Sequence, residues 1–113
     1  MKLENRIRTL LLKLGIDPSN KGYDYLVEAI QMCYGDRKCL FAITSILYPT
    51  IAKNNSASKS AVERAMRQAI FRAINTNYDA FDLLIFPISY DSGSLTNSQF
   101  IGACVEYLKM HEE

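Results

Sequence analysis

The chain has 113 residues, of which 49% are hydrophobic and 22% charged, so it is long enough for one compact domain and too hydrophobic for a disordered tail. Thirteen Lys and Arg residues against twelve Asp and Glu residues give a net charge of +1, which excludes a histone-like polycation and an acidic tail. No apolar run approaches the roughly 18 residues of a membrane span, and the charged N-terminus lacks the apolar region of a secretion signal. We therefore expect a single domain over residues 1–113, no membrane partner and a cytoplasmic location.

The cysteine and histidine content argues against a metal centre and against an enzyme. Cys33, Cys39 and Cys104 form an odd set without CxxC spacing, and His111 is the only histidine, so the supply of zinc ligands is too small. A lone histidine near the chain end is also poorly placed to act as a rigid base beside a nucleophile. The motifs GxGxxG, P-loop and HExxH are absent. We expect free thiols, no metal, no cofactor and no catalytic residue, and hence a binding module.

The hydrophobic period of the first half of the chain is helical. Leucine and isoleucine side chains form one stripe over residues 3–14, and Gly15 follows as a helix stop. A second helix is expected over about 22–34, and a third over about 37–48 that ends at Pro49. The apolar residues of which the third helix should bury some are Leu40, Phe41, Ile43, Ile46 and Leu47.

A short helix, a polar turn and a long helix come next. We expect the short helix over about 49–53, the turn over 54–57 and the long helix over about 58–75. At 100° per residue, one sector of the long helix is apolar and should face the core. The residues of this sector are Val62, Met66, Ala69, Ile70 and Ala73.

The last part of the chain predicts two further helices. A short one is expected over 79–86, and an irregular loop or a short extended hairpin over 87–95. Thr96 and Gln99 have the spacing of a capping box, which predicts the start of the final helix at Thr96. No strand is convincing, so we predict an all-α fold, a compact bundle of about six helices. The apolar face of the final helix consists of Phe100, Ile101, Cys104, Val105 and Leu108.

Positive charge is concentrated on the short helix, the turn and the long helix. Residues 53–72 carry five basic groups and one acidic group, whereas residues 73–113 carry one basic and six acidic groups. Arg64 and Arg67 are i, i+3 neighbours on the side of the long helix opposite its apolar sector. Two arginines so placed suit a recognition helix in the major groove, where Arg binds guanine O6 and N7. Glu63 could accept from cytosine N4 or orient an arginine.

The spacing of the two helices also suits a helix-turn-helix over about 49–75. Ile51 and Ala52 on the short helix precede a turn of four or five residues, and Val62 follows Ala52 by ten residues. The small Ala52 allows the two helices to cross closely. The alternative is that Arg64 and Arg67 only make an exposed helix face polar.

Four sequence strings, in order along the chain, are similar to one known family. These are KGYDYLVEAI (21–30), LYPTIAK (47–53), AVERAMRQAI (61–70) and LTNSQFI (95–101). They resemble the C-terminal effector domain of the stage-zero sporulation response regulator of endospore-forming Firmicutes. The resemblance implies a helical domain around a helix-turn-helix that binds double-stranded DNA at a short promoter box, often as two domains in tandem.

The resemblance also implies roles for residues of this chain. The base-reading Glu-Arg pair and the Arg three positions later correspond to Glu63, Arg64 and Arg67, and a serine near the helix start corresponds to Ser60. Gln68 stands where a His is frequent and keeps its hydrogen-bonding capacity. In total, base contacts are expected from Glu63, Arg64, Arg67 and Gln68, and phosphate contacts from Lys53, Ser58, Lys59 and Ser60.

The chain departs from the family pattern at three places. Ala61 stands where Arg is frequent, which removes one positive contact, and residues 90–94 carry no cation where the family has lysine. The turn after the long helix is one residue shorter, in a region where the family contacts RNA polymerase sigma factor. The receiver domain of the resembled regulator is absent from the sequence, which fits either a fragment or a stand-alone domain.

Phe71 lies on the same sector as the two arginines, one turn further along the helix. Either a bend or a neighbouring loop covers it, or it contacts protein: a second copy of the domain or the polymerase. The near-zero net charge and the acidic C-terminal third leave one rival function open, a helical protein–protein adaptor without a DNA role.

Overall fold

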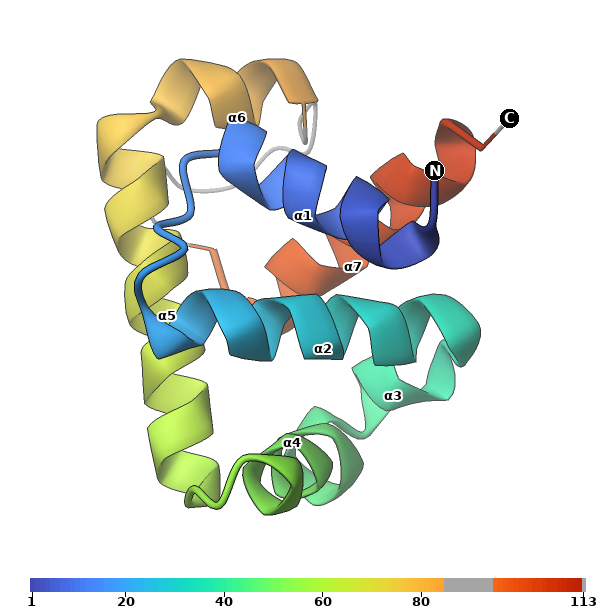
Figure 1. The fold of residues 1–113 in the computed structure, drawn as a ribbon, viewed down its shortest axis with the longest axis vertical. Coiled ribbons are helices and arrows are strands. Elements are labelled where there is room, and N and C mark those ends of the chain that lie inside the picture. Colours follow the sequence, from blue (N-terminus) through green and yellow to red (C-terminus); the bar gives the residue numbers. More distant parts are fainter. Residues whose placement is uncertain (85–94, 113) are drawn as a thin grey trace.

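The computed structural model describes residues 1–84 and 95–112, and this part of the chain consists of helices and turns without a strand (Figure 1). The predicted all-α bundle is therefore confirmed. None of the described helices is both long and apolar enough to cross a membrane. The helices are α1 (Leu3–Lys13), α2 (Lys21–Gly35), α3 (Lys38–Phe41), the π-helix η1 (Ile43–Leu47), α4 (Tyr48–Asn54), α5 (Lys59–Thr76), α6 (Tyr78–Leu84) and α7 (Asn97–Met110).

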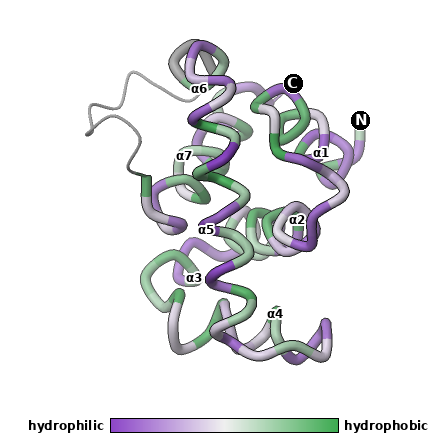
Figure 2. The backbone as a smooth tube through the Cα atoms, turned by 90° about the vertical axis from the view of Figure 1, so that its left-hand side faces the viewer, coloured by the Kyte–Doolittle hydropathy of each residue, from purple (hydrophilic) through white to green (hydrophobic). Residues whose placement is uncertain are grey.

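Helix α2 crosses the middle of the bundle and packs against α1, α5 and α7 (Figure 1). The apolar stripe predicted for the first helix is buried from Ile7 to Leu14, and the five apolar positions predicted for the last helix are all buried. In Figure 2 the hydropathy alternates along α5 every few residues, as expected for a helix with one face on the core. Every described α-helix contributes to this core, through Ile7, Leu26, Cys39, Ile51, Val62, Phe81 and Phe100 among others.

Two helix boundaries follow the local chemistry that the sequence predicted. Gly15 ends α1 with φ +84°, a conformation that glycine adopts without the clash of a Cβ. At the start of α7, the Thr96 hydroxyl accepts from the Gln99 N–H at 3.1 Å, and the Gln99 side chain accepts from the Thr96 N–H at 3.0 Å. The predicted capping box is thus confirmed. The irregular segment predicted over 87–95 lies outside the described residues except for Leu95, as do the last two residues of the short helix predicted over 79–86.

The prediction of one helix over 37–48 is wrong. Helix α3 ends at Phe41, Ala42 leaves the helical region with φ −127° and ψ 41°, and the chain resumes as the π-helix η1. Pro49 does not end a helix but lies in the first turn of α4. Proline is tolerated there, because N–H groups in the first turn of a helix are not needed for its hydrogen bonds. Because the break removes the single apolar stripe, Leu47 is the one fully buried member of the predicted set, while Phe41 is 80% exposed.

Helix α5 is held against α2 by an unusually close approach of backbone. A Cβ on Gly22 would lie 2.4 Å from the carbonyl oxygen of Ala65 and 2.9 Å from the Cβ of Ala69. Real Cβ atoms do not come this near, and a backbone oxygen cannot turn aside as a flexible side chain can. The absence of a side chain at Gly22 therefore determines where α5 lies against the core.

We predict that Gly22→Ala lowers the free energy of unfolding by about 1–3 kcal/mol, because the added methyl group forces α2 and α5 apart. Gly35→Ala is the matched control, since nothing lies within 4 Å of a Cβ at that position. Alanine at Gly35 should be neutral or stabilising by up to about 1 kcal/mol, through the lower entropy of the unfolded chain. Urea unfolding of both variants tests this, and equal midpoints would show that the crossing tolerates a side chain.

Candidate functional site

Helix α5 begins and packs as its sequence predicts. Ser58 is the N-cap, and its side-chain oxygen accepts from the Ala61 N–H at 3.1 Å. The inner face of the helix is fully buried, including all five predicted positions, and Ile74 joins them. Since one side of α5 is committed to the core, the side chains on its other side are free to meet a partner.

The structure brings the predicted site residues together on and beside the outer face of α5. Arg64, Arg67 and Gln68 are exposed, and Glu63 is half-buried. Lys53 lies in the last turn of α4 and is exposed, as are three residues at the start of α5 or just before it. Cations thus flank the turn between the two helices on both sides. The three residues at the start of α5 are Ser58, Lys59 and Ser60.

The two arginines differ in their surroundings. Arg67 Nη1 donates to both carboxylate oxygens of Glu63, at 3.0 and 3.2 Å, so this pair spans one helical turn. Arg64 makes no hydrogen bond or ion pair with the described residues. An exposed i, i+4 pair contributes only about 0.3–0.5 kcal/mol, so Arg67 can leave Glu63 at a small cost. Arg64 is therefore available at once, and Arg67 is held in one orientation until a stronger acceptor arrives.

Glu28 of α2 forms hydrogen bonds with the residues at the end of α4 and the start of the turn that leads to α5. The carboxylate of Glu28 accepts from Asn54 Nδ2 at 2.7 Å and from Asn55 Nδ2 at 3.0 Å. Asn55 Nδ2 also donates to the Ile51 carbonyl at 2.7 Å, inside α4. Glu28 thus ties the end of α4 to the bundle. Sequence reasoning missed this residue, and the one signal for it was the pair of adjacent asparagines after a short helix.

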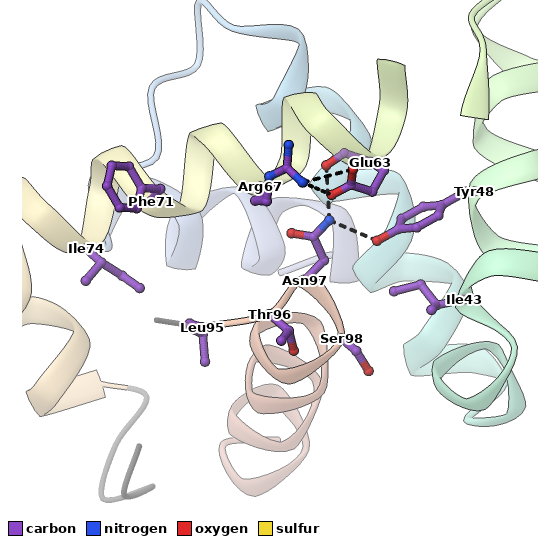
Figure 3. Close-up of a pocket in the computed structure, with 10 residues that line it drawn as sticks. All are labelled: Ile43, Tyr48, Glu63, Arg67, Phe71, Ile74, Leu95, Thr96, Asn97 and Ser98. Atoms are coloured by element: carbon purple, nitrogen blue, oxygen red, sulfur yellow. Dashed lines mark hydrogen bonds and ion pairs between the residues drawn. The ribbon is translucent and has the colours of Figure 1, made fainter. Parts of the chain in front are cut away.

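A second polar contact joins α4, α5 and α7 (Figure 3). Asn97 is 6% exposed, and its Nδ2 donates to the Tyr48 hydroxyl at 2.9 Å and to the Glu63 carbonyl at 3.1 Å. Burial raises the pKa of Tyr48, which keeps its hydroxyl neutral. The string around Asn97 predicted the capping motif and carried part of the family resemblance, but no pattern in it indicated this connection.

Of the other residues considered as functional, Phe71 is exposed and the three cysteines are buried. Phe71 is 56% exposed, so the described residues leave most of its ring uncovered. The three cysteines are buried free thiols, and burial raises the pKa of Cys33 to about 12. A thiol with such a pKa is protonated and a poor nucleophile. Among the residues that the structure describes, no three His, Cys, Asp or Glu side chains gather as a metal site would require.

The turn before α5 contains a strained residue that allows a direct test. Ser56 has φ +51°, a region where a side chain costs roughly 1–2 kcal/mol and glycine does not pay that cost. We predict that Ser56→Gly stabilises the protein by about 0.5–1 kcal/mol. The relief of strain in the folded state is larger than this, but the greater conformational entropy of glycine in the unfolded chain offsets part of it.

Ser60→Gly is the matched control for this variant, because Ser60 is exposed and lies in the first turn of α5 with ordinary helical backbone. There the same substitution should destabilise by a few tenths of a kcal/mol up to about 1 kcal/mol. Thermal unfolding of the two variants compares the signs directly. A lower melting temperature for Ser56→Gly would contradict the assignment of strain to this turn.

Comparison with protein families places these features in one known group. The family model described as sporulation initiation factor Spo0A C terminal matches residues 7–108. The match runs from the first turns of α1 to the last turns of α7, so it includes α4, α5 and the residues Glu28 and Asn97 that support them. The resemblance identified from the four sequence strings is thereby confirmed. The chain belongs to the family of Spo0A C-terminal domains of sporulation initiation factors.

Proposed function

We propose that this chain is a DNA-binding transcription regulator of the sporulation type, in which α4 and α5 form a helix-turn-helix and α5 reads a short promoter box in the major groove. One observation carries the proposal. Arg64 and Arg67 project from the outer side of a helix whose inner side is entirely committed to the core, in a member of the Spo0A C-terminal family. A helix that is supported in this way can enter a groove without losing its own packing.

The base contacts are assigned by the hydrogen-bonding capacity of each side chain. Arg64, which has no partner among the described residues, binds guanine O6 and N7 as a bidentate donor. Arg67 leaves Glu63 and makes the same kind of contact, and the released Glu63 carboxylate accepts from cytosine N4. Gln68, the residue after Arg67, is also exposed and can form a bidentate pair of hydrogen bonds with adenine.

The phosphate contacts come from the two sides of the turn. Lys53 at the end of α4 and Lys59 at the start of α5 supply positive charge, and the Ser60 hydroxyl supplies a donor. Ser58 already accepts from a backbone N–H as the N-cap, so it would contact phosphate by donating its hydroxyl proton. The free N–H groups and the positive dipole end of α5 favour a phosphate at the same place.

We predict that Arg64→Ala and Arg67→Ala each weaken specific DNA binding by ~1–3 kcal/mol, the cost of losing a bidentate contact to guanine. The measurement is fluorescence anisotropy with a duplex that the wild-type protein selects from random sequence. Arg37→Ala is the control, because Arg37 is exposed next to α3 and away from α5. If all three variants bind as the wild type does, with unchanged circular dichroism, the outer face of α5 does not read DNA.

The alternative function, a protein–protein adaptor without a DNA role, is favoured by the exposed Phe71. Salt distinguishes the two functions. Contacts with several phosphates release counterions, so the affinity for DNA must fall steeply as salt rises, whereas an apolar contact is nearly insensitive to salt.

A contact with RNA polymerase sigma factor would involve another part of the surface. Tyr78 is 47% exposed just after the end of α5, in the region where the family resemblance implies this contact.

We further propose that two copies bind adjacent boxes cooperatively. One recognition helix reads few base pairs, and a net charge of +1 adds little non-specific attraction, so a single domain should bind weakly. A small contact between copies raises the effective concentration of the second domain, and the exposed Phe71 next to the reading face is the candidate for it.

Comparison of one-box and two-box duplexes tests this cooperativity. The wild type should bind the two-box duplex more tightly per box by about tenfold, which corresponds to a contact of ~1.4 kcal/mol. Phe71→Ala should lose that gain and keep its one-box affinity. Equal affinity per box in the wild type would show that the domains bind independently.

A further inference from the structure

A cavity of about 470 Å³ lies between the helix pair α4–α5 and the start of α7 (Figure 3). A volume of this size is within the range of small-molecule sites, which are mostly apolar and carry a few polar groups. Most of the residues that line this cavity have no role in the proposed function. The described residues that line it are Ile43, Tyr48, Glu63, Arg67, Phe71, Ile74, Leu95, Thr96, Asn97 and Ser98.

The apolar walls of the cavity come from three parts of the chain. Ile43 belongs to η1, Phe71 and Ile74 belong to α5, and Leu95 precedes α7. Figure 3 shows Phe71 and Ile74 at one end of the cavity and Ile43 at the other, so an occupant would touch apolar side chains at both ends. Such walls suit a flat apolar body, for which the half-exposed ring of Phe71 offers a stacking surface.

A buried acceptor of the cavity has no partner among the residues that the structure describes. Both amide hydrogens of Asn97 are used by its contacts to Tyr48 and to the Glu63 carbonyl, whereas its Oδ1 is buried and accepts no hydrogen bond from the described residues. Figure 3 shows this oxygen pointing away from Tyr48, toward the side on which Leu95 and Phe71 lie. Buried acceptors in native proteins are nearly always satisfied, so the oxygen calls for an N–H or O–H donor.

The charges of the cavity cancel each other. Its one cation, Arg67, and its one anion, Glu63, are paired at 3.0 Å, so among the described lining residues no charge is left over for an ionic ligand. We propose that the cavity binds a small neutral aromatic molecule with one N–H or O–H donor, of the indole or phenol class, whose donor is held by Asn97 Oδ1. The ring then packs against Phe71 and Leu95, on the side to which Oδ1 points.

Indole and N-methylindole test the donor, because they share the ring and differ in the N–H. In a titration of the ¹⁵N-labelled wild-type protein followed by NMR, indole should give saturable shifts at the residues that line the cavity. N-methylindole should bind about tenfold more weakly, since it leaves Asn97 Oδ1 without a partner. Non-saturable shifts, shifts away from the cavity, or equal affinity for the two molecules would overturn the proposal.

Two phenylalanine variants test the place of binding. Phe71→Ala removes a wall of the cavity and should weaken indole binding several-fold, while Phe41→Ala removes a ring that is 80% exposed on α3 and should leave it unchanged. Equal weakening by both variants would mean that indole binds exposed rings in general. These titrations contain no DNA, and Arg64 is not among the residues that line the cavity, so the ligand site and the proposed function can fail independently: loss of DNA binding in Arg64→Ala says nothing about indole, and the reverse also holds.

Discussion

The backbone contact between α2 and α5 at Gly22 is the constraint on which the other features of the site depend. A helix that meets its neighbour through a carbonyl oxygen, with no side chain between them, cannot shift without breaking the contact. The backbone of α5 is therefore fixed before a partner binds. Only the exposed side chains need to rotate on binding, and their rotation costs less free energy than the movement of a helix.

Two polar contacts extend this constraint to α4. Glu28 holds the end of α4 through two asparagines, and Asn97 holds its beginning through Tyr48 while also binding a carbonyl of α5. Each contact joins elements that are distant in sequence. The Asn97 contact also pairs groups that would otherwise be buried unpaired, whereas the Glu28 contacts are exposed to solvent. The angle between α4 and α5 is thus set at both ends of the shorter helix, by α2 on one side and by α7 on the other.

The helical period was enough to predict the elements that obey it. The stripe of α5 from Val62 to Ala73 is buried as expected, because a long amphipathic helix has one way to face a core. The break at Ala42 was not predictable in this way, since a π-helix is rare and the hydrophobic period does not mark one. The partners of Glu28 and Asn97 lie 26 to 49 residues away, and no pattern within one helix shows such pairs. The arginine face could be predicted from spacing and resemblance, but not that Arg67 is paired with Glu63 while Arg64 has no partner in the described part of the chain.

The unequal state of Arg64 and Arg67 has a consequence for discrimination between DNA sequences. On a random sequence nothing compensates the loss of the Glu63 pair, so Arg67 stays neutralised and adds nothing to the electrostatic attraction. On a matching box Arg67 binds guanine and the released Glu63 carboxylate accepts from cytosine N4, so both groups find new partners and the net charge of the interface stays the same. Since neither group moves to a phosphate, the exchange releases no further counterion, and the preference that it gives for the correct sequence would depend little on ionic strength.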